Sequence, residues 1–158
     1  MFAPRRRRAA ATKSLRPLLH HQGLLAPGSM WVDEKGVARQ LTSGDLRVVA
    51  PFNAHVQRLR EVLDRVPGGD DVPVGTVDKF QGQEAPVVIY SMATSHPDDA
   101  PRGMEFLFNP NRLNVATSRA RCLAVAVGSA ELFGVSCTSV RQMGLANGFC
   151  RLGERADT

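Results

Sequence analysis

Three short apolar runs constrain the fold of this 158-residue chain more than any other feature of its sequence. Consecutive apolar positions, rather than alternating ones, are typical of strands that are buried on both faces. Segments with helical spacing separate the runs, and this alternation favours an α/β fold, a parallel sheet with helices on both faces. The runs are Asp45–Phe52 ("DLRVVAPF"), Pro86–Ser91 ("PVVIYS") and Cys122–Gly128 ("CLAVAVG").

The segments between and after these runs predict helices. Apolar residues recur at helical spacing from Asn53 to Val66, with Asn53 as a candidate N-cap. Asn109 directly before Pro110 is a helix-start signal, because proline is favoured in the first turn. Residues 140–155 form an amphipathic pattern and predict a last helix.

The length of the chain predicts a single domain. We predict a poorly ordered basic lead-in over residues 1–29, with a short helix around Leu15–His20, then a domain over residues 30–152 and a tail over residues 153–158. The net charge of +5 favours a polyanionic partner. Arg5–Arg8 supply four of the positive charges, however, and we interpret them as a solvated basic tail, with an arm that contacts nucleic acid as the alternative.

The cysteines and the lengths of the apolar runs predict the surroundings of the protein. Three cysteines with wide spacing show no zinc or disulfide pattern, which favours a reducing cytoplasm. No apolar run approaches the roughly 20 residues that a membrane-spanning helix needs, so we predict no membrane association.

An acidic pair, Asp33-Glu34, lies between two short segments that predict a hairpin over residues 30–42. Acidic pairs that hold magnesium in ATPases follow a buried apolar strand. This pair lies in the hairpin turn instead, and we therefore reject a magnesium site here.

The segment "VGTVDKFQGQE", Val74–Glu84, joins two predicted strands and carries unusual polar chemistry. Gly82 allows a ligand to approach the backbone closely, Gln81 can bind a base or sugar edge, and Glu84 can accept from hydroxyl groups. Ligands in parallel sheets gather at the carboxyl ends of the strands, and we expect this turn to lie there. Each residue alone is compatible with an ordinary loop.

The helix that follows Asn109 presents two arginines on one flank. Arg112 and Arg119 are seven residues apart and align within about 20° on a helix. A guanidinium group stays charged and offers planar donors, which suits a phosphate. A surface arginine paired with a carboxylate is the alternative, and the helix alone leaves both interpretations open.

Three segments, "VVAPFNAHV", "GTVDKFQGQE" and "NRLNVATSRAR", resemble motifs IV, V and VI of superfamily 1 helicases of the Upf-like type, in order and in spacing. The resemblance covers about residues 31–151 and is to the second RecA-like domain of these proteins. The ending "RQMGLANGFCRL" is also similar to the C-terminus of bacterial proteins that fuse a RecB-like nuclease to such a helicase.

The resemblance implies a nucleotide site. Arg119, the first arginine of "TSRAR", lies where the family places its arginine finger, which stabilises charge on the γ-phosphate of ATP. Gly82 and Glu84 lie where the family contacts the nucleotide, and Arg112 and Gln81 are predicted to bind it as well. Gln81 lies between this site and the nucleic-acid site, where it could couple the two.

The resemblance also implies contacts with single-stranded nucleic acid. Thr76 matches a position that touches the strand backbone in the family, and Asn53 and His55 belong to the motif that precedes it. Relatives usually have a glutamine where this chain has His55, which is a departure from the motif.

A larger departure is that the chain contains no G-x-x-x-x-G-K-[ST] sequence. ATP with Mg²⁺ is the expected cofactor, and the resemblance implies that the magnesium ligands lie on a first RecA-like domain, in cis or in trans. Single-stranded nucleic acid is the other expected partner, and the chain alone is expected to be nearly inactive. Two alternatives stay open: a non-catalytic nucleic-acid-binding module and a degraded gene product.

Overall fold

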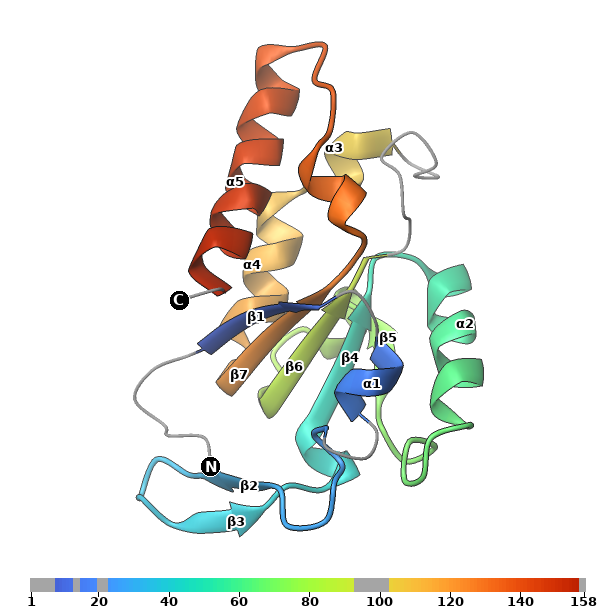
Figure 1. Ribbon diagram of the computed structural model, residues 1–158, viewed down its shortest axis with the longest axis vertical. Coiled ribbons are helices and arrows are strands. Elements are labelled where there is room, and N and C mark those ends of the chain that lie inside the picture. Colours follow the sequence, from blue (N-terminus) through green and yellow to red (C-terminus); the bar gives the residue numbers. More distant parts are fainter. Residues whose placement is uncertain (1–7, 13–14, 20–22, 93–102, 157–158) are drawn as a thin grey trace.

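A parallel sheet forms the centre of the computed structural model, which describes residues 8–12, 15–19, 23–92 and 103–156 (Figure 1). Its five strands are all parallel and lie in the order β1-β7-β6-β4-β5. A separate antiparallel hairpin consists of β2 and β3. The strands are β1 (Arg8–Thr12), β2 (Met30–Val32), β3 (Ala38–Gln40), β4 (Leu46–Ala50), β5 (Val74–Thr76), β6 (Ala85–Ser91) and β7 (Ala120–Val127).

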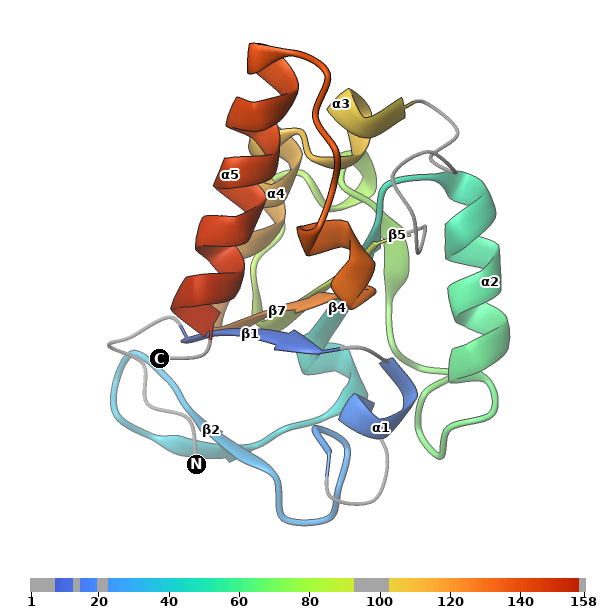
Figure 2. The same ribbon diagram turned by 45° about the horizontal axis from the view of Figure 1, so that its top comes forward.

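Helices cover both faces of this sheet. The side chains of α1 and α2 pack in one apolar cluster, and those of α3, α4 and α5 pack in another. In both views α4 and α5 lie side by side, and α2 lies away from them (Figures 1 and 2). The α-helices are α1 (Leu15–Leu19), α2 (Asn53–Leu63), α3 (Gly103–Leu107), α4 (Pro110–Ser118) and α5 (Val140–Ala156), and the 3₁₀ helices are η1 (Ser43–Asp45), η2 (Asp78–Phe80) and η4 (Ala130–Phe133).

Strand β6 shows why its sequence is apolar at consecutive positions. Every residue of the strand is buried, with Val87 and Ile89 in the α2 cluster and Val88 and Tyr90 in the α4 cluster. Successive side chains of a strand point to opposite faces, so a sheet covered on both sides needs apolar residues at all positions. The predicted α/β fold of the RecA-like type is confirmed.

Part of the predicted lead-in lies on the domain. The short helix predicted around Leu15 is present as α1, and its residues Leu15 and Leu19 are buried. The prediction placed no strand in this segment, but β1 pairs in parallel with β7 along its whole length. An alanine-rich segment has a low intrinsic preference for strands, so it is the edge of β7 that orders β1. Residues Arg5–Arg7 lie outside the described residues.

The two helix-start signals have different outcomes. Asn109 caps α4, because its side-chain oxygen accepts a hydrogen bond from the Asn111 N–H at 2.9 Å. Asn53 is the first residue of α2 rather than its cap, and the capping position is taken by Phe52, which offers no side-chain acceptor. The predicted last helix is confirmed as α5.

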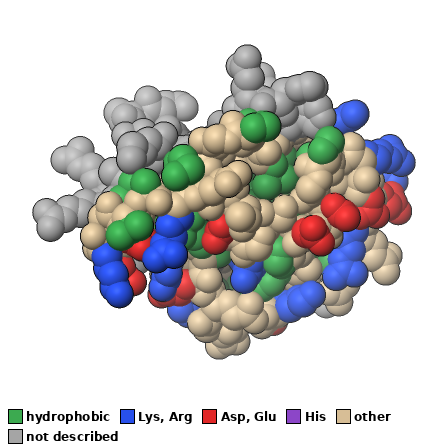
Figure 3. All heavy atoms as spheres, turned by 90° about the horizontal axis from the view of Figure 1, so that it is seen from below, with side chains coloured by type: hydrophobic (Ala, Val, Ile, Leu, Met, Phe, Trp, Pro, Cys, Tyr) green, Lys and Arg blue, Asp and Glu red, His purple; other side chains and the backbone are tan. Residues whose placement is uncertain are grey.

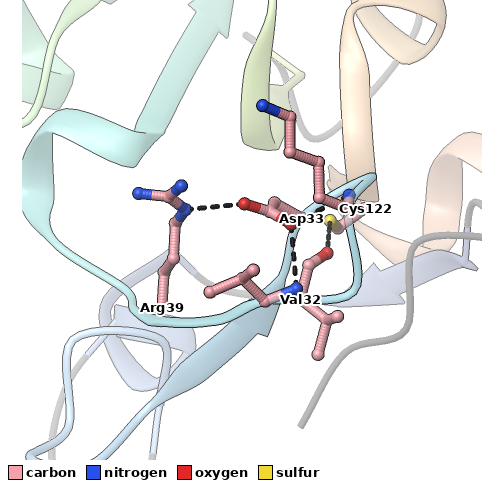
Figure 4. Close-up of polar contacts among 6 residues, drawn as sticks. Val32, Asp33, Arg39 and Cys122 are labelled. Atoms are coloured by element: carbon pink, nitrogen blue, oxygen red, sulfur yellow. Dashed lines mark hydrogen bonds and ion pairs between the residues drawn. The ribbon is translucent and has the colours of Figure 1, made fainter.

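The predicted hairpin is confirmed, and Asp33 organises it (Figure 4). One carboxylate oxygen of Asp33 accepts from the N–H groups of Lys35 and Val37, both at 2.9 Å, and the other accepts from Arg39 Nε at 2.8 Å. The carboxylate is therefore engaged in fixing the turn. A weak hydrogen bond from Cys122 Sγ to the Val32 carbonyl, at 3.7 Å, joins the hairpin to β7.

These contacts predict a pH-dependent stability. The hydrogen bond from Arg39, followed by those from the backbone, lowers the pKa of Asp33 below its ordinary value. Because the folded-state pKa is lower, the stabilisation exists above the unfolded-state pKa and is lost as the pH falls through the folded-state pKa. We expect Asp33→Asn to lower the free energy of unfolding at pH 7 and to reduce its decline towards pH 3.

Urea unfolding followed by the fluorescence of Trp31, the single tryptophan, measures this difference. Glu34→Gln, one residue further along the same turn and exposed, is the matched control. Equal pH dependence in Asp33→Asn and the unmodified protein would show that the carboxylate does not stabilise the hairpin.

Candidate functional site

The segment over residues 77–84 crosses one face of the sheet. It leaves the carboxyl end of β5, contains η2, and enters the amino end of β6. Phe80 is buried in the α4 cluster and anchors the crossing. Gly75 permits this path, because a Cβ atom there would lie 2.5 Å from Lys79 Cδ and 3.1 Å from the Phe80 ring. We call residues 77–84 the crossing segment.

A groove of about 220 Å³ lies between the crossing segment and α4. The spacing of Arg112 and Arg119 predicted a shared flank, and both arginines line this groove. Gln81 lines it from the opposite side. The structure therefore brings together the predicted arginine finger, Arg119, and two predicted nucleotide-binding residues, Gln81 and Arg112. The full lining is Val77, Asp78, Gln81, Asn111, Arg112, Val115 and Arg119.

Arg119 is the C-cap residue of α4 and is held by its own backbone. Its carbonyl accepts from the Ala85 N–H at 3.1 Å, which fixes the end of α4 against the start of β6. The Arg119 Nε is buried and has no hydrogen-bond partner among the described residues. A buried N–H without a partner costs free energy, so this position of Arg119 needs an explanation beyond the contacts of the folded domain.

Arg47 is a functional candidate that the sequence analysis missed. It is a charged residue within the buried strand β4, and its guanidinium carbon lies 5.9 Å from the centre of the Phe80 ring. It lines a small cavity of about 10 Å³ together with Arg119, and its Nε also lacks a partner. The signal was present in "LRVVA", where one arginine interrupts an apolar run that both faces of the sheet should bury.

Glu84 lies at the amino edge of the sheet, whereas the prediction placed its turn at the carboxyl edge, and Arg119 lies at the same amino edge. Ala85 and Ala120 are paired at the start of β6 and β7, and the two site residues directly precede them. The prediction assigned the whole turn to one edge, but the crossing segment connects both edges. At the amino edge Glu84 forms an ion pair with Arg121, Oε2 to Nε at 3.4 Å, and both side chains are about half exposed.

The predicted nucleic-acid residues lie at the carboxyl edge. Thr76 ends β5, and Asn53 is exposed at the start of α2. His55 lies in the first turn of α2, and its Nε2 is 3.0 Å from the Oγ of Ser91, at the end of β6. Burial lowers the pKa of His55, so its imidazole is neutral at pH 7. The neutral ring has one hydrogen-bond donor and one acceptor, and it adds no positive charge to this edge.

Arg112 contacts an aromatic ring that the sequence analysis also missed. Its guanidinium carbon lies 4.0 Å from the centre of the Phe106 ring in α3. The nearby Tyr90 is 2% exposed and its hydroxyl has no hydrogen-bond partner among the described residues. Burial raises the pKa of Tyr90 to about 12, and the charge of Arg112 acts in the opposite direction.

The face of the molecule shown in Figure 3 is not uniformly basic. Seen from below, Lys and Arg side chains lie intermixed with Asp and Glu (Figure 3). Within the described ranges, no helix is long and apolar enough to cross a bilayer. The same part of the chain holds no group of three His, Cys, Asp or Glu residues that could ligate a metal ion. Cys122, Cys137 and Cys150 form no disulfide bond with one another.

The parallel sheet, the helices on both faces and the crossing segment define a RecA-like domain. Residues 31–131 match the sequence model of a family described as AAA domain, and the chain belongs to this family. The similar curated proteins include helicases, which supports the resemblance to superfamily 1 helicases.

Three relatives illustrate this similarity. The putative helicase mov-10-B.1 of Danio rerio is 33% identical over 61% of the chain, and the RNA helicase Mov10l1 of Mus musculus is 34% identical over 60%. The DNA polymerase alpha-associated DNA helicase A of Schizosaccharomyces pombe is 36% identical over 58%. The matched parts make up 10%, 8% and 13% of these proteins, so the chain spans about a tenth of their length.

Gly82 provides a test of the geometry at this site. Its φ is +80°, in the left-handed region, and a Cβ atom there would meet no atom within 4 Å. We expect Gly82→Ala to lower the free energy of unfolding by about 1–2 kcal/mol through backbone strain alone. Gly82→Asn should cost less, because asparagine tolerates this conformation better.

Chemical denaturation measures both variants against Gly44→Ala. Gly44 has an ordinary φ, and the nearest atom to an added Cβ is 3.8 Å away, so this control should change little. If Gly82→Ala and Gly44→Ala changed the free energy of unfolding equally, the left-handed backbone conformation assigned to Gly82 would be incorrect.

Proposed function

We propose that this chain is the second RecA-like domain of an ATP-dependent DNA or RNA helicase. The observation that carries the proposal is the position of Arg119, whose Nε is buried and unpartnered beside a groove that Gln81 and Arg112 also line. The family membership of residues 31–131 and the similarity to helicases support this proposal.

In this proposal the groove and the amino edge form one wall of a nucleotide site. Arg119 is the arginine finger and stabilises negative charge on the transferred phosphoryl group. Arg112 offers further donors, Gln81 offers an amide, and the open space over Gly82 admits a ligand to the backbone. Glu84 exchanges its exposed partner Arg121 for ribose hydroxyls.

ATP with Mg²⁺ supplies the free energy of hydrolysis that drives such a motor. The residues present here fit the phosphates, because Arg112 and Arg119 form no ion pair with a described carboxylate. The magnesium ligands and the phosphate-binding loop are proposed to lie on a first RecA-like domain, in cis or in trans. Without that domain the chain is nearly inactive. A bacterial parent carrying a RecB-like nuclease is the narrower form of this proposal.

The carboxyl edge forms the proposed strand-binding surface. The Thr76 hydroxyl and the exposed amide of Asn53 bind the backbone of a single strand, and neutral His55 contributes a hydrogen bond. The crossing segment joins Thr76 to Glu84, so it connects the strand-binding edge to the nucleotide edge. A shift of this segment on nucleotide binding changes both surfaces together, which a motor requires.

The net charge of +5 favours a second candidate, a nucleic-acid-binding module without catalysis. Such a module binds single strands with the salt dependence expected of the helicase domain, but a nucleotide does not change its affinity for them. The two candidates therefore differ in ATP turnover and in the effect of a nucleotide on the affinity for single strands.

Arg119→Ala tests the nucleotide wall in a protein that joins this chain to a first RecA-like domain. We expect ATP turnover to fall by about a thousandfold or more, because an arginine finger acts on the transition state, while nucleotide binding largely survives. Steady-state phosphate release measures turnover. Arg58→Ala, which removes an exposed arginine on α2, is the control and should leave turnover unchanged. Persistent turnover in Arg119→Ala would refute the finger assignment.

Thr76→Val tests the carboxyl edge in the chain itself. The substitution removes a hydroxyl at nearly constant volume, and loss of one hydrogen bond should weaken binding of a labelled oligodeoxythymidine by roughly threefold to tenfold. Fluorescence anisotropy at several salt concentrations measures the affinity, and Thr76→Ser, which keeps the hydroxyl, should retain it. Normal affinity in Thr76→Val would place the strand elsewhere on the domain.

A further inference from the structure

Three side chains from three helical segments form a continuous stack near the carboxyl edge. Phe52, the capping residue of α2, stacks on Phe106 of α3 with ring centres 5.0 Å apart and planes inclined by 17°. The Phe106 ring in turn contacts the guanidinium of Arg112 at 4.0 Å. We call Phe52, Phe106 and Arg112 the aromatic stack. Figure 1 shows α3 and the start of α2 at the same end of the molecule.

In the described part of the chain, Arg112 contacts the Phe106 ring and no carboxylate. Among the described residues Arg112 forms neither a hydrogen bond nor an ion pair. Arginine stacks on aromatic rings through its flat face, which leaves the donors at the edge of the guanidinium available. Arg112 also lines the groove between α4 and the crossing segment. The stack therefore restricts a long side chain without consuming its hydrogen-bonding capacity.

The stack connects the carboxyl edge of the sheet to the groove. Asn53 and His55 are proposed to bind the nucleic-acid strand. Phe52 directly precedes Asn53 and lies in the same turn of the chain as His55. Arg112 lies at the groove that is proposed to bind phosphate. Stacked aromatic pairs and cation–π contacts are each stabilising, so movement of Arg112 against α2 must break at least one of them.

We infer that Phe106 is a positioning residue, which holds Arg112 so that its donors face a phosphate oxyanion in the groove. In this inference Phe52, which stacks on Phe106, connects Arg112 to the start of α2, where the nucleic-acid strand is proposed to bind. The inference rests on the proposed role of Arg112. It adds a physical connection between the two surfaces that is separate from the crossing segment.

The first experiment uses the 158-residue chain and inorganic tripolyphosphate as the probe, with affinity from ³¹P NMR titration. Arg112→Gln should weaken binding by about tenfold, since it removes charge-assisted hydrogen bonds. Phe106→Leu should weaken it by roughly threefold, because the ring contact is lost and the guanidinium is less restricted. Phe106→Tyr, which keeps the ring, should bind as the unmodified chain does.

Three readouts separate positioning from a general loss of structure. In the Arg112→Gln background, Phe106→Leu should have no further effect on the affinity. The Arg112 Nε–Hε resonance should lose its ring-current shift in Phe106→Leu and keep it in Phe106→Tyr. Phe149 lies on α5 and forms an aromatic pair with Phe108. Phe149→Leu disturbs this other pair and should leave the affinity for tripolyphosphate unchanged.

The outcomes distinguish the inference from the proposed function. Weak binding by Arg112→Gln with normal binding by Phe106→Leu would overturn positioning and leave the role of Arg112 intact. Additive losses, or equal losses in Phe149→Leu, would also overturn it, because they indicate general destabilisation. Normal binding by Arg112→Gln, or no binding by the unmodified chain, would refute the role of Arg112 itself.

The second experiment tests whether Phe52 couples phosphate binding in the groove to strand binding at the start of α2. Tripolyphosphate should change the affinity of the unmodified chain for an oligodeoxythymidine, and Phe52→Leu should reduce this change while each ligand alone still binds. Phe52→Tyr should preserve it. An unchanged coupling in Phe52→Leu would show that Phe52 does not connect the surfaces, and absence of coupling in the unmodified chain would show the same.

Discussion

Burial of β6 on both faces determines most of the remaining structure. All seven of its residues are buried, and it lies between β4 and β7 with parallel pairing on each side. A parallel neighbour must enter the sheet from the same edge, so the chain has to travel back across a face after β5 and again between β6 and β7. The crossing segment and α4 are these two returns, and both lie on the same face, where Phe80 and Leu113 pack against it. The groove between them is a consequence of this connectivity.

The same connectivity explains why residues that are close in sequence lie on opposite edges. Thr76 and Glu84 are eight positions apart, yet one ends β5 and the other precedes β6. In a nucleotide-driven motor this is an advantage, because a single rigid crossing with a buried anchor at Phe80 can transmit a displacement from one ligand to the other. The aromatic stack gives the domain a second connection, from Arg112 to the start of α2.

The apolar runs predicted the strands and the double-sided burial, because consecutive apolar residues have few other stable arrangements. Helix spacing also predicted that Arg112 and Arg119 share one flank of the helix, since seven residues complete nearly two turns. Four features depended on distant contacts that spacing does not encode. The edge at which Glu84 lies follows from a crossing, β1 is ordered by β7, and Arg47 and Phe106 gain their significance only from residues that the fold brings beside them.

Electrostatics connect these observations. Arg47, Arg112 and Arg119 lie on the α4 face around the crossing segment, and none of them forms an ion pair with a described carboxylate. Like charges in a partly desolvated region repel one another, and unpartnered Nε groups on Arg47 and Arg119 add the cost of lost hydrogen bonds. The free domain carries this cost within its folded state. In the proposed function, an oxyanion in the groove contacts Arg112 and Arg119 and offsets part of the repulsion between these two arginines.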